Sequence, residues 1–270
     1  MENLQKISAK IRGQVVQLSH QAGTPHLGSS LSCVDLMVSI YWNFLNISPE
    51  TCTDENRDRF ILSKGHAITT LYSILSEKGF FDKIEFERYA EPQSPLPEHP
   101  SPNCVPGIEA ATGSLGHGLS LALGMALAAK LKKIDYKTYV LLSDGECNEG
   151  STWEAAMMAP THKLNNLIAI VDFNKWQATG RSSDILSLEP LEKKFEAFGW
   201  NAIRIDGHDF SDIKNALDKA SSSKLLPTAI IADTVKGKGV KLMEDDNNWH
   251  YRIPKEEEVL SAHKELGLIV

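Results

Sequence analysis

The chain has 270 residues, of which 42% are hydrophobic and 7% aromatic, and its 35 acidic and 28 basic side chains give a formal net charge of −7 at pH 7. This hydrophobic share is ordinary for a globular protein and excludes an intrinsically disordered chain. The negative charge argues against nucleic acid as the main partner, although small anions can still bind in a local pocket.

Two features bear on cellular location. The four cysteines lie far apart with no C-x-x-C pair, and the charged N-terminal segment lacks the apolar core of a signal peptide. The stretch from Ala110 to Ala129 has no Asp, Glu, Lys or Arg and is nominally long enough to span a bilayer. Its first half is rich in Gly, Ser and Thr, which favours a turn before a buried helix. We therefore expect a cytoplasmic protein with free thiols and no membrane segment.

Hydrophobic periodicity divides the chain into helices and strands. Helices are expected at residues 4–21, 33–45, 66–78, 119–133, 150–162, 191–198, 212–220 and about 255–266. Strands are expected at residues 59–62, 138–143, 167–172, 202–205 and 228–232. Residues 91–107 are rich in proline, and so long an irregular segment within a compact domain is usually functional or a linker.

From residue 138 onward, strands that are apolar throughout alternate with helices. This alternation predicts an α/β fold in which a parallel sheet is flanked by helices on both faces. We find no internal repeat, and we interpret residues 1–270 as a single domain. Ligands of such sheets bind beyond the carboxyl ends of the strands, so candidate functional residues are sought there.

Polar residues follow two successive predicted strands. Asp144 and Gly145 come directly after the strand at 138–143, and Asn174 follows the strand at 167–172. Carboxylate and amide oxygens suit Mg²⁺, and a diphosphate can approach a glycine backbone closely. Taken singly, Asp144 is better explained as a helix cap and Asn174 as a turn residue. Their joint position at one sheet edge favours a metal–diphosphate site.

With these residues in view, the chain resembles the transketolase family of thiamine diphosphate enzymes. The family's G-D-G motif, followed after about 30 residues by Asn, is present as SDG…N with Ser143 in place of the first glycine. The resemblance implies a thiamine diphosphate-binding fold. It also implies that Mg²⁺, for which Ca²⁺ or Mn²⁺ could substitute, binds Asp144, Asn174 and the main-chain carbonyl of Trp176.

Further family motifs extend the resemblance over nearly the whole chain. The segments that match are HLGSSLSCVD at 26–35, LSKGHA at 62–67, EHP at 98–100, TGSLGHG at 112–118, VKGKG at 235–239 and NNWH at 247–250. Two local departures accompany them: Pro25 precedes His26 instead of following it, and His117 replaces the usual Gln.

The resemblance assigns roles to residues on these motifs. Cofactor-binding residues are expected to be Ser29, His66, Gly113, Ser114, Leu115, Asp144, Gly145, Glu149, Asn174, Lys236 and His250. Catalytic residues are expected to be His26, His66, His99 and His250. Imidazoles can hydrogen-bond sugar hydroxyls and transfer protons near neutral pH, which fits this chemistry. The other histidines, at positions 20, 162, 208 and 263, are interpreted as ordinary surface or core residues.

The implied activity is transfer of a two-carbon ketol unit from a ketose phosphate to an aldose, with the cofactor as electron sink. Transketolases have three domains, and the chain ends about twenty residues after His250. The resemblance therefore implies a separate C-terminal subunit that supplies the other two domains, in a heterotetramer. Glu149 and Glu154 would lie at the subunit interface, although charges at a helix start also complement its dipole.

Three alternatives remain at this point. The alpha subunit of a pyruvate-type 2-oxo acid dehydrogenase shares the D-G…N pattern, and a deoxyxylulose phosphate synthase would need the missing domains. A non-catalytic transketolase-like homologue is a third possibility, although Asp144, Asn174, His66 and His250 are all retained. The glycines at 113, 116 and 118 do not match G-x-G-x-x-G, so NAD binding is poorly supported. The sugar substrate is left open, with the pentose phosphate pathway and branched or modified ketose phosphates as options.

Overall fold

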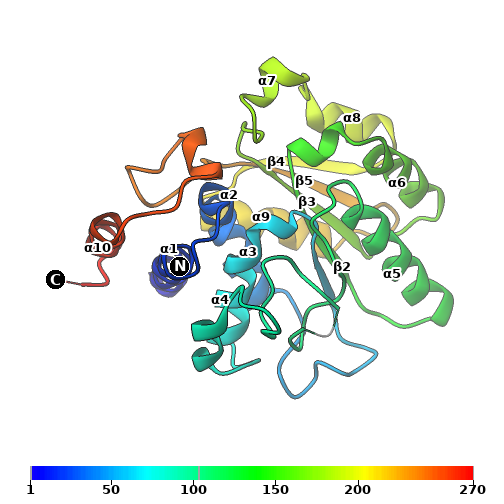
Figure 1. Cartoon of the computed structure of the whole chain (residues 1–270). Coiled ribbons are helices and arrows are strands. Elements are labelled where there is room, and N and C mark those ends of the chain that lie inside the picture. The colour runs from blue at the N-terminus through cyan, green and yellow to red at the C-terminus, as the bar shows by residue number, and fades with distance from the viewer. Residues whose placement is uncertain (1, 103, 270) are drawn as a thin grey trace.

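The computed structural model describes residues 2–102 and 104–269. Five parallel strands form a sheet in the order β1-β2-β3-β5-β4 (Figure 1). Their bounds are β1 Arg59–Leu62, β2 Thr138–Ser143, β3 Leu167–Phe173, β4 Asn201–Asp206 and β5 Thr228–Asp233. All five strands were predicted to within two residues, because rows of apolar side chains flanked by polar residues define them clearly. The predicted α/β fold class is confirmed.

The register of the sheet aligns the carboxyl ends of the central strands. Ser143 at the end of β2 lies opposite Asp172 of β3, and Phe173 lies opposite Asp233 of β5. β2 and β3 are buried along their whole length, since helices cover both of their faces. The polar residues that follow these strands therefore emerge together at one edge of the molecule.

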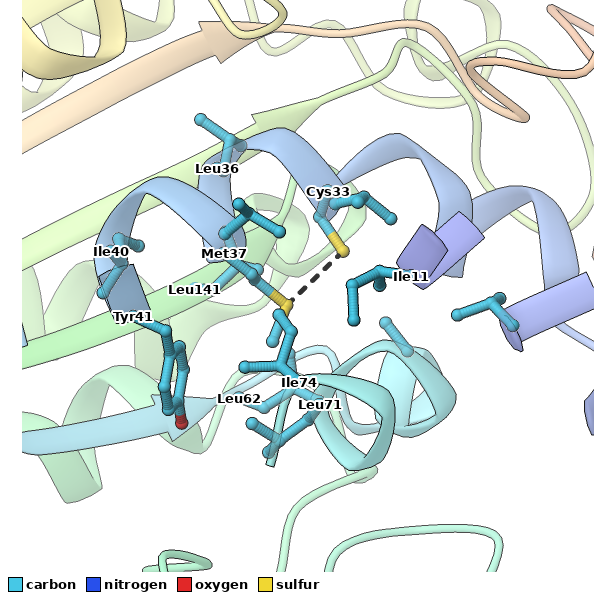
Figure 2. Close-up of a cluster of buried hydrophobic side chains, with 14 of the residues drawn as sticks. Ile11, Cys33, Leu36, Met37, Ile40, Tyr41, Leu62, Leu71, Ile74 and Leu141 are labelled. Carbon is cyan, nitrogen blue, oxygen red and sulfur yellow. Dashed lines mark hydrogen bonds between the residues drawn. The ribbon is translucent and has the colours of Figure 1, made fainter. Parts of the chain in front are cut away.

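One face of the sheet packs against a layer formed by α3, α4 and α9, with α1 and α10 outside it (Figure 1). The bounds are α1 Glu2–Ala22, α3 Val34–Asn43, α4 Ile68–Glu77, α9 Phe210–Ser221 and α10 Glu256–Glu265. Figure 2 shows the centre of this layer, where Ile11, Met37 and Leu71 meet side chains of the sheet. Burying these apolar surfaces provides the main stabilisation of this half of the molecule.

The opposite face is covered by α5 (Gly118–Lys132), α6 (Gly150–Thr161) and α8 (Leu191–Ala197). Small side chains such as Ala126 and Ala156 face the sheet, which lets these helices approach it closely. The uncharged stretch 110–129 is therefore divided as expected between an irregular segment and α5. Within residues 2–102 and 104–269, no helix is long and apolar enough to cross a membrane.

Several elements differ from the predicted pattern. The short helix α2 (Leu27–Ser32) was not anticipated, because the sequence LGSSLS lacks helical hydrophobic periodicity. The helix expected from His66 begins at Ile68, after a 3₁₀ turn η1 (Gly65–Ala67) that places His66 at the sheet edge. Further short helices are η2 Lys83–Arg88, η3 Gly145–Asn148, α7 Ser182–Ile185 and η4 Asn247–His250. Residues 91–107, apart from 103, which lies outside the described residues, contain no helix or strand, as predicted.

Candidate active site

A cavity of about 410 Å³ lies at the carboxyl ends of β2 and β3. The predicted site residues that line it are His26, Ser29, His66, His99, Gly113, Leu115, Gly145, Glu149, Asn174, Trp176 and His250. Asp144 and Lys236 are completely buried next to these lining residues. Ser114 is exposed and lines a separate surface depression together with His117. Residues from both halves of the chain thus meet where the strand-end argument placed them.

Four histidines form a cluster with His26 at its centre. The ring centroid of His26 lies 4.8 Å from that of His250, 5.3 Å from that of His66 and 6.2 Å from that of His99. The backbone of His26 has a positive φ of 70° and donates a 2.8 Å hydrogen bond to the carbonyl oxygen of His250. Gly113 makes room for this arrangement, since a Cβ there would lie 2.7 Å from the His99 ring.

The pKa values of His26, His66 and His250 favour the uncharged imidazole near neutral pH. Burial, together with His99, Lys236 and Lys64, lowers the pKa of His26 to about 4. Burial and the Lys236 charge lower the pKa of His250 to about 3. Burial also places the pKa of His66 well below its ordinary value. Neutral imidazoles offer both a donor and an acceptor, which suits hydrogen bonding to hydroxyl groups of a ligand.

Asp144 is a buried carboxylate that no cationic side chain contacts within residues 2–102 and 104–269. Its Oδ1 accepts a 2.9 Å hydrogen bond from the Gly145 amide, and its Oδ2 accepts from the Lys175 amide at 2.9 Å and from Ser182 Oγ at 2.8 Å. Burial, with the Asp172 charge nearby, raises the pKa of Asp144 to about 6 despite these donors. A bound divalent cation would remove this cost, because it supplies the missing positive charge.

The neighbouring polar groups fit that cation. Asn174 is buried and its Oδ1 accepts a 3.1 Å hydrogen bond from the Trp176 amide, which fixes the turn after β3. One carboxylate, one amide oxygen and one main-chain carbonyl form an all-oxygen donor set of the kind Mg²⁺ prefers, with water and phosphate oxygens completing it. In the part of the chain that the structure describes, no group of three or more His, Cys, Asp or Glu offers a competing metal site.

A buried ion pair lies beside this set and was missed by sequence reasoning. Lys64 Nζ donates to Asp172 Oδ2 at 2.5 Å and to the carbonyl oxygen of Ser29 at 2.9 Å, and both charged side chains are fully buried. Asp172 also accepts from Ser32 Oγ at 2.6 Å and from Thr234 Oγ1. The sequence signal that could have revealed this ion pair is the acidic residue at the end of the otherwise apolar strand LIAIVD. The pair joins α2, η1, β3 and the segment after β5.

Lys236 extends the network toward the histidines. Its Nζ donates to Asn247 Oδ1 at 2.7 Å and lies 3.3 Å from Nδ1 of His250. Burial, reinforced by the Lys64 charge, lowers the pKa of Lys236 to about 8. Because an ammonium group can only donate, Nδ1 of His250 acts as acceptor in this contact and the proton of that imidazole sits on Nε2. Lys236 therefore sets both the local positive charge and the tautomer of a cavity histidine.

Glu146 is a second buried carboxylate that the sequence reasoning missed. It accepts hydrogen bonds from Ser63 Oγ, from the Gly116 amide at 3.0 Å and from the Ser143 amide at 2.9 Å. Burial raises its pKa, although these three donors oppose that shift. Glu146 thereby ties the glycine-rich segment 112–118 to the turn after β2 and fixes the wall of the cavity.

Three buried polar atoms at the cavity have no hydrogen-bond partner among the described residues. They are Nδ1 of His26, Oδ1 of Asn148 and Nε2 of Gln177. A buried polar atom without a partner costs about 1–3 kcal/mol, so such atoms gather where a ligand supplies the missing bonds. Their side chains mark the cavity as a site for a polar ligand.

The histidines outside the motifs lie away from the cavity, as expected. His20 hydrogen-bonds the carbonyl oxygen of Pro254, His263 that of Gly13, and His162 is exposed at the end of α6. His208 contacts Asp35 at 2.9 Å within a partly buried ion cluster. None of the four lines the cavity.

Comparison with known proteins gives matches along the whole chain. A family model described as transketolase, thiamine diphosphate binding domain, matches residues 4–269. A subunit of the apulose-4-phosphate transketolase of Phocaeicola vulgatus is 40% identical over 267 residues, covering 99% of this chain and 95% of that protein. The 6-deoxy-6-sulfo-D-fructose transketolase subunit SqwG of a Clostridium species is 38% identical over 242 residues, covering 90% of this chain and 88% of that protein.

Larger relatives match over part of their length. Human transketolase is 37% identical over 257 residues, which are 94% of this chain and 41% of that protein. The crystal structure of transketolase from Campylobacter jejuni superposes with a TM-score of 0.94 at 33% identity, covering 99% of this chain and 43% of that one. The chain therefore belongs to the transketolase family of transferases and contains its thiamine diphosphate-binding domain.

Proposed function

We propose that this protein is one subunit of a two-chain transketolase that transfers a ketol unit between sugar phosphates and requires a separate C-terminal subunit. The observation that supports this most directly is the difference in coverage. The chain aligns with 95% of a relative that is named as one subunit of a transketolase, but with only 41% of human transketolase. We interpret residues 1–270 as a single domain that contributes one half of an active site.

The proposed cofactors are thiamine diphosphate and Mg²⁺, and the chain's own groups fit both. Asp144, Asn174 and the carbonyl of Trp176 would hold the metal, and Gly145 would lie against the diphosphate. This assignment is supported by the buried carboxylate of Asp144, which contacts no cationic side chain among the residues that the structure describes. When bound, thiamine diphosphate supplies the nucleophilic carbon and the electron sink that ketol transfer needs.

The four histidines are proposed to act on the sugar. Nε2–H of His250 can donate to a substrate oxygen because Nδ1 faces Lys236. His26 and His99 are placed to bind hydroxyl groups and to move protons, and His66 to stabilise negative charge by hydrogen bonding. Their lowered pKa values keep the imidazoles of His26 and His250 neutral, so that each offers one hydrogen-bond donor and one acceptor.

The partner subunit is proposed to cover the surface beside the cavity. α5 and α6, whose first turns lie next to the cavity wall, expose large apolar side chains, with Leu121 38%, Met158 41% and Met157 50% exposed. Adjacent exposed apolar groups of this kind are typical of protein interfaces. Glu149 lines the cavity and Glu154 is exposed on α6, in keeping with the interface position that the family resemblance implies. We propose a heterotetramer with two copies of each subunit, located in the cytoplasm.

Reconstitution tests the two-chain proposal. The purified chain, with Mg²⁺ and thiamine diphosphate, is assayed for ketol transfer alone and after mixing with the candidate C-terminal subunit from the same source. We expect turnover only in the mixture, together with a mass by light scattering that corresponds to two copies of each chain. Robust transfer by the single chain would refute the proposal.

Substrate choice is tested in the same mixture. Xylulose 5-phosphate represents the pentose phosphate pathway, while apulose 4-phosphate and 6-deoxy-6-sulfo-D-fructose represent the compounds named for two relatives. We expect one of these ketoses to serve as donor. Activity with pyruvate and none with any ketose would instead assign the chain to the 2-oxo acid dehydrogenases.

A variant separates sugar chemistry from cofactor binding. His99→Ala should lower kcat about a hundredfold while changing the Kd for thiamine diphosphate less than threefold, since general acid–base groups typically contribute 10²–10⁴-fold. His162→Ala, on the exposed end of α6, is the matched control and should retain full activity. Equal losses in kcat and in cofactor affinity for His99→Ala would contradict the assigned role.

A further inference from the structure

Gln177 is a cavity residue that neither its motif context nor the family resemblance assigns. It follows Trp176 in the turn after β3, and its side chain lines the cavity. Its Nε2 is buried and has no acceptor among the described residues. A buried amide N–H without an acceptor has lost its hydrogen bonds to water without replacing them, which costs free energy. We therefore expect a ligand atom that accepts a hydrogen bond from it.

The backbone around Gln177 is held firmly, so the side chain is not simply part of a loose loop. The Gln177 amide donates to the Gly180 carbonyl oxygen at 2.8 Å, and the preceding Lys175 amide donates to Asp144 Oδ2 at 2.9 Å. The carbonyl oxygen of Ala178 accepts from Asn247 Nδ2 at 3.1 Å. The turn therefore presents the Gln177 side chain to the cavity in a preorganised position.

The surroundings of Gln177 favour an anion. A Cβ built on Gly145 would lie 3.5 Å from Cγ and 3.8 Å from Cδ of Gln177, so the amide lies over the glycine of the D-G turn. Asn247, which holds Ala178, accepts a 2.7 Å hydrogen bond from the Lys236 ammonium with its other amide atom. A donor over a glycine backbone, in a cavity wall that also holds a buried ammonium, is suited to a negatively charged oxygen.

Asn148 provides a contrast within the same cavity. Its orphaned atom is the acceptor Oδ1, which would be repelled by a phosphate oxygen and needs a donor from the ligand. The two orphaned atoms thus differ in what they need, because Nε2 of Gln177 lacks an acceptor and Oδ1 of Asn148 lacks a donor. Because the Gln177 side chain lies over Gly145, we expect the acceptor that its Nε2 lacks to lie near that glycine.

We propose that Gln177 Nε2 donates a hydrogen bond to a phosphoryl oxygen of the diphosphate bound at Gly145. This assignment rests on the proposed function, because it takes thiamine diphosphate as the ligand. The Gln177 amide would then bind the same anion as the Gly145 backbone, the divalent cation and the positive charge of Lys236. A sugar phosphate is the other source of the same chemistry, and the experiment below distinguishes the two.

Binding measurements on the reconstituted two-chain enzyme test the proposal. Calorimetric titrations with thiamine diphosphate, and separately with inorganic pyrophosphate, are made in the presence of Mg²⁺. Gln177→Leu removes the donor at similar size, and Gln177→Glu replaces it with a carboxylate that repels phosphate. Gln21→Leu at the end of α1, beside a different surface depression, is the matched control.

We expect Gln177→Leu to raise the Kd of both ligands about ten- to hundredfold, because the loss of one hydrogen bond to a charged group typically changes affinity by this factor. Gln177→Glu should weaken them further, and Gln21→Leu should not change them. Unchanged affinities in both Gln177 variants, with thermal unfolding like that of the wild type, would overturn the proposal. So would a raised KM for the sugar phosphate with an unchanged Kd for thiamine diphosphate. If the wild-type pair bound no thiamine diphosphate at all, the proposed function itself would fail instead.

Discussion

Asp144, which directly follows β2, and Asp172, in the neighbouring strand β3, are fully buried carboxylates whose surroundings differ in one respect. Asp172 contacts the Lys64 ammonium, which together with Ser32 and Thr234 outweighs the effect of burial and lowers its pKa. Asp144 receives hydrogen bonds only from neutral donors, and burial raises its pKa to about 6. Among the described residues, Asp172 therefore has a cationic partner, whereas Asp144 has none.

This difference indicates that Asp172 stabilises the fold, whereas Asp144 is suited to binding a ligand. A buried ion pair whose donors and acceptors are all satisfied joins elements that are distant in sequence, and it needs nothing from outside. A buried carboxylate held only by amides and a hydroxyl is less stable until a cation arrives. The comparison therefore predicts different responses. Removing the charge of Lys64, the partner of Asp172, should destabilise the fold, whereas removing the charge of Asp144 should abolish the response to ligands.

The largest expected effect is on stability, from Lys64→Met. Methionine is similar in length but leaves the Asp172 carboxylate buried without its cation, which typically costs about 3–5 kcal/mol. Urea unfolding of the isolated chain measures this loss. The double variant Lys64→Met with Asp172→Asn should recover a large part of it, because the unpaired charge is gone. A single variant as stable as the wild type would show that the pair is not what holds these elements together.

The second effect concerns ligand response in Asp144→Asn. In the wild-type two-chain enzyme, Mg²⁺ and thiamine diphosphate at a hundredfold excess over Kd should raise the free energy of unfolding by about 2.7 kcal/mol. A chelator should reverse this gain. Asp144→Asn should show neither change, while its stability without ligands stays within about 1 kcal/mol of the wild type. A full ligand response in this variant would place the metal elsewhere.

The sequence predicted the strands well and the buried charges poorly, for a physical reason. Strands such as TYVLLS and LIAIVD are apolar on both faces, and this property is local. The ion pair between Lys64 and Asp172 depends on two residues 108 positions apart, so no local pattern reveals it. Motif resemblance found the histidines because each falls on a recognisable segment.

The short helix α2 and the residue Gln177 illustrate the remaining gap. α2 has little hydrophobic periodicity and is stabilised from outside, by Lys64 at the Ser29 carbonyl and by Thr70 at the Ser30 carbonyl. Gln177 lies in a turn where the sequence suggests only a connection between elements. In both cases the informative neighbours come from other parts of the chain, and only the folded arrangement brings them together.

Another buried carboxylate, Asp35, extends the comparison to the effect of pH on stability. Burial opposes its ionisation, but the hydrogen bond from His208 and the Arg12 guanidinium, at 2.6 and 2.9 Å, outweigh burial and place its pKa well below the ordinary 3.8. Because the folded pKa is the lower one, Asp35 contributes stability above about pH 4. That contribution is lost as the pH falls below this value, with a slope of up to about 1.4 kcal/mol per pH unit.

Unfolding curves between pH 2 and 7 test this expectation. Asp35→Asn should be less stable than the wild type at neutral pH and should lose less stability on acidification. The exposed Asp184→Asn is the matched control and should follow the wild-type curve. Parallel acid branches for wild type and Asp35→Asn would mean that other carboxylates dominate acid unfolding.

The smallest effect is expected at Arg204, which pairs with more acids than Lys64 but lies near the surface. It donates to Asp233 at 2.7 and 3.0 Å and to Glu189 at 2.8 and 3.0 Å, while its side chain is 32% exposed. Water screens these charges, so Arg204→Met should cost less than about 1 kcal/mol in urea unfolding. High salt should nearly abolish this difference but leave the Lys64→Met loss in place, because buried pairs are screened far less. Similar salt sensitivity for both variants would mean that burial is not what distinguishes the two sites.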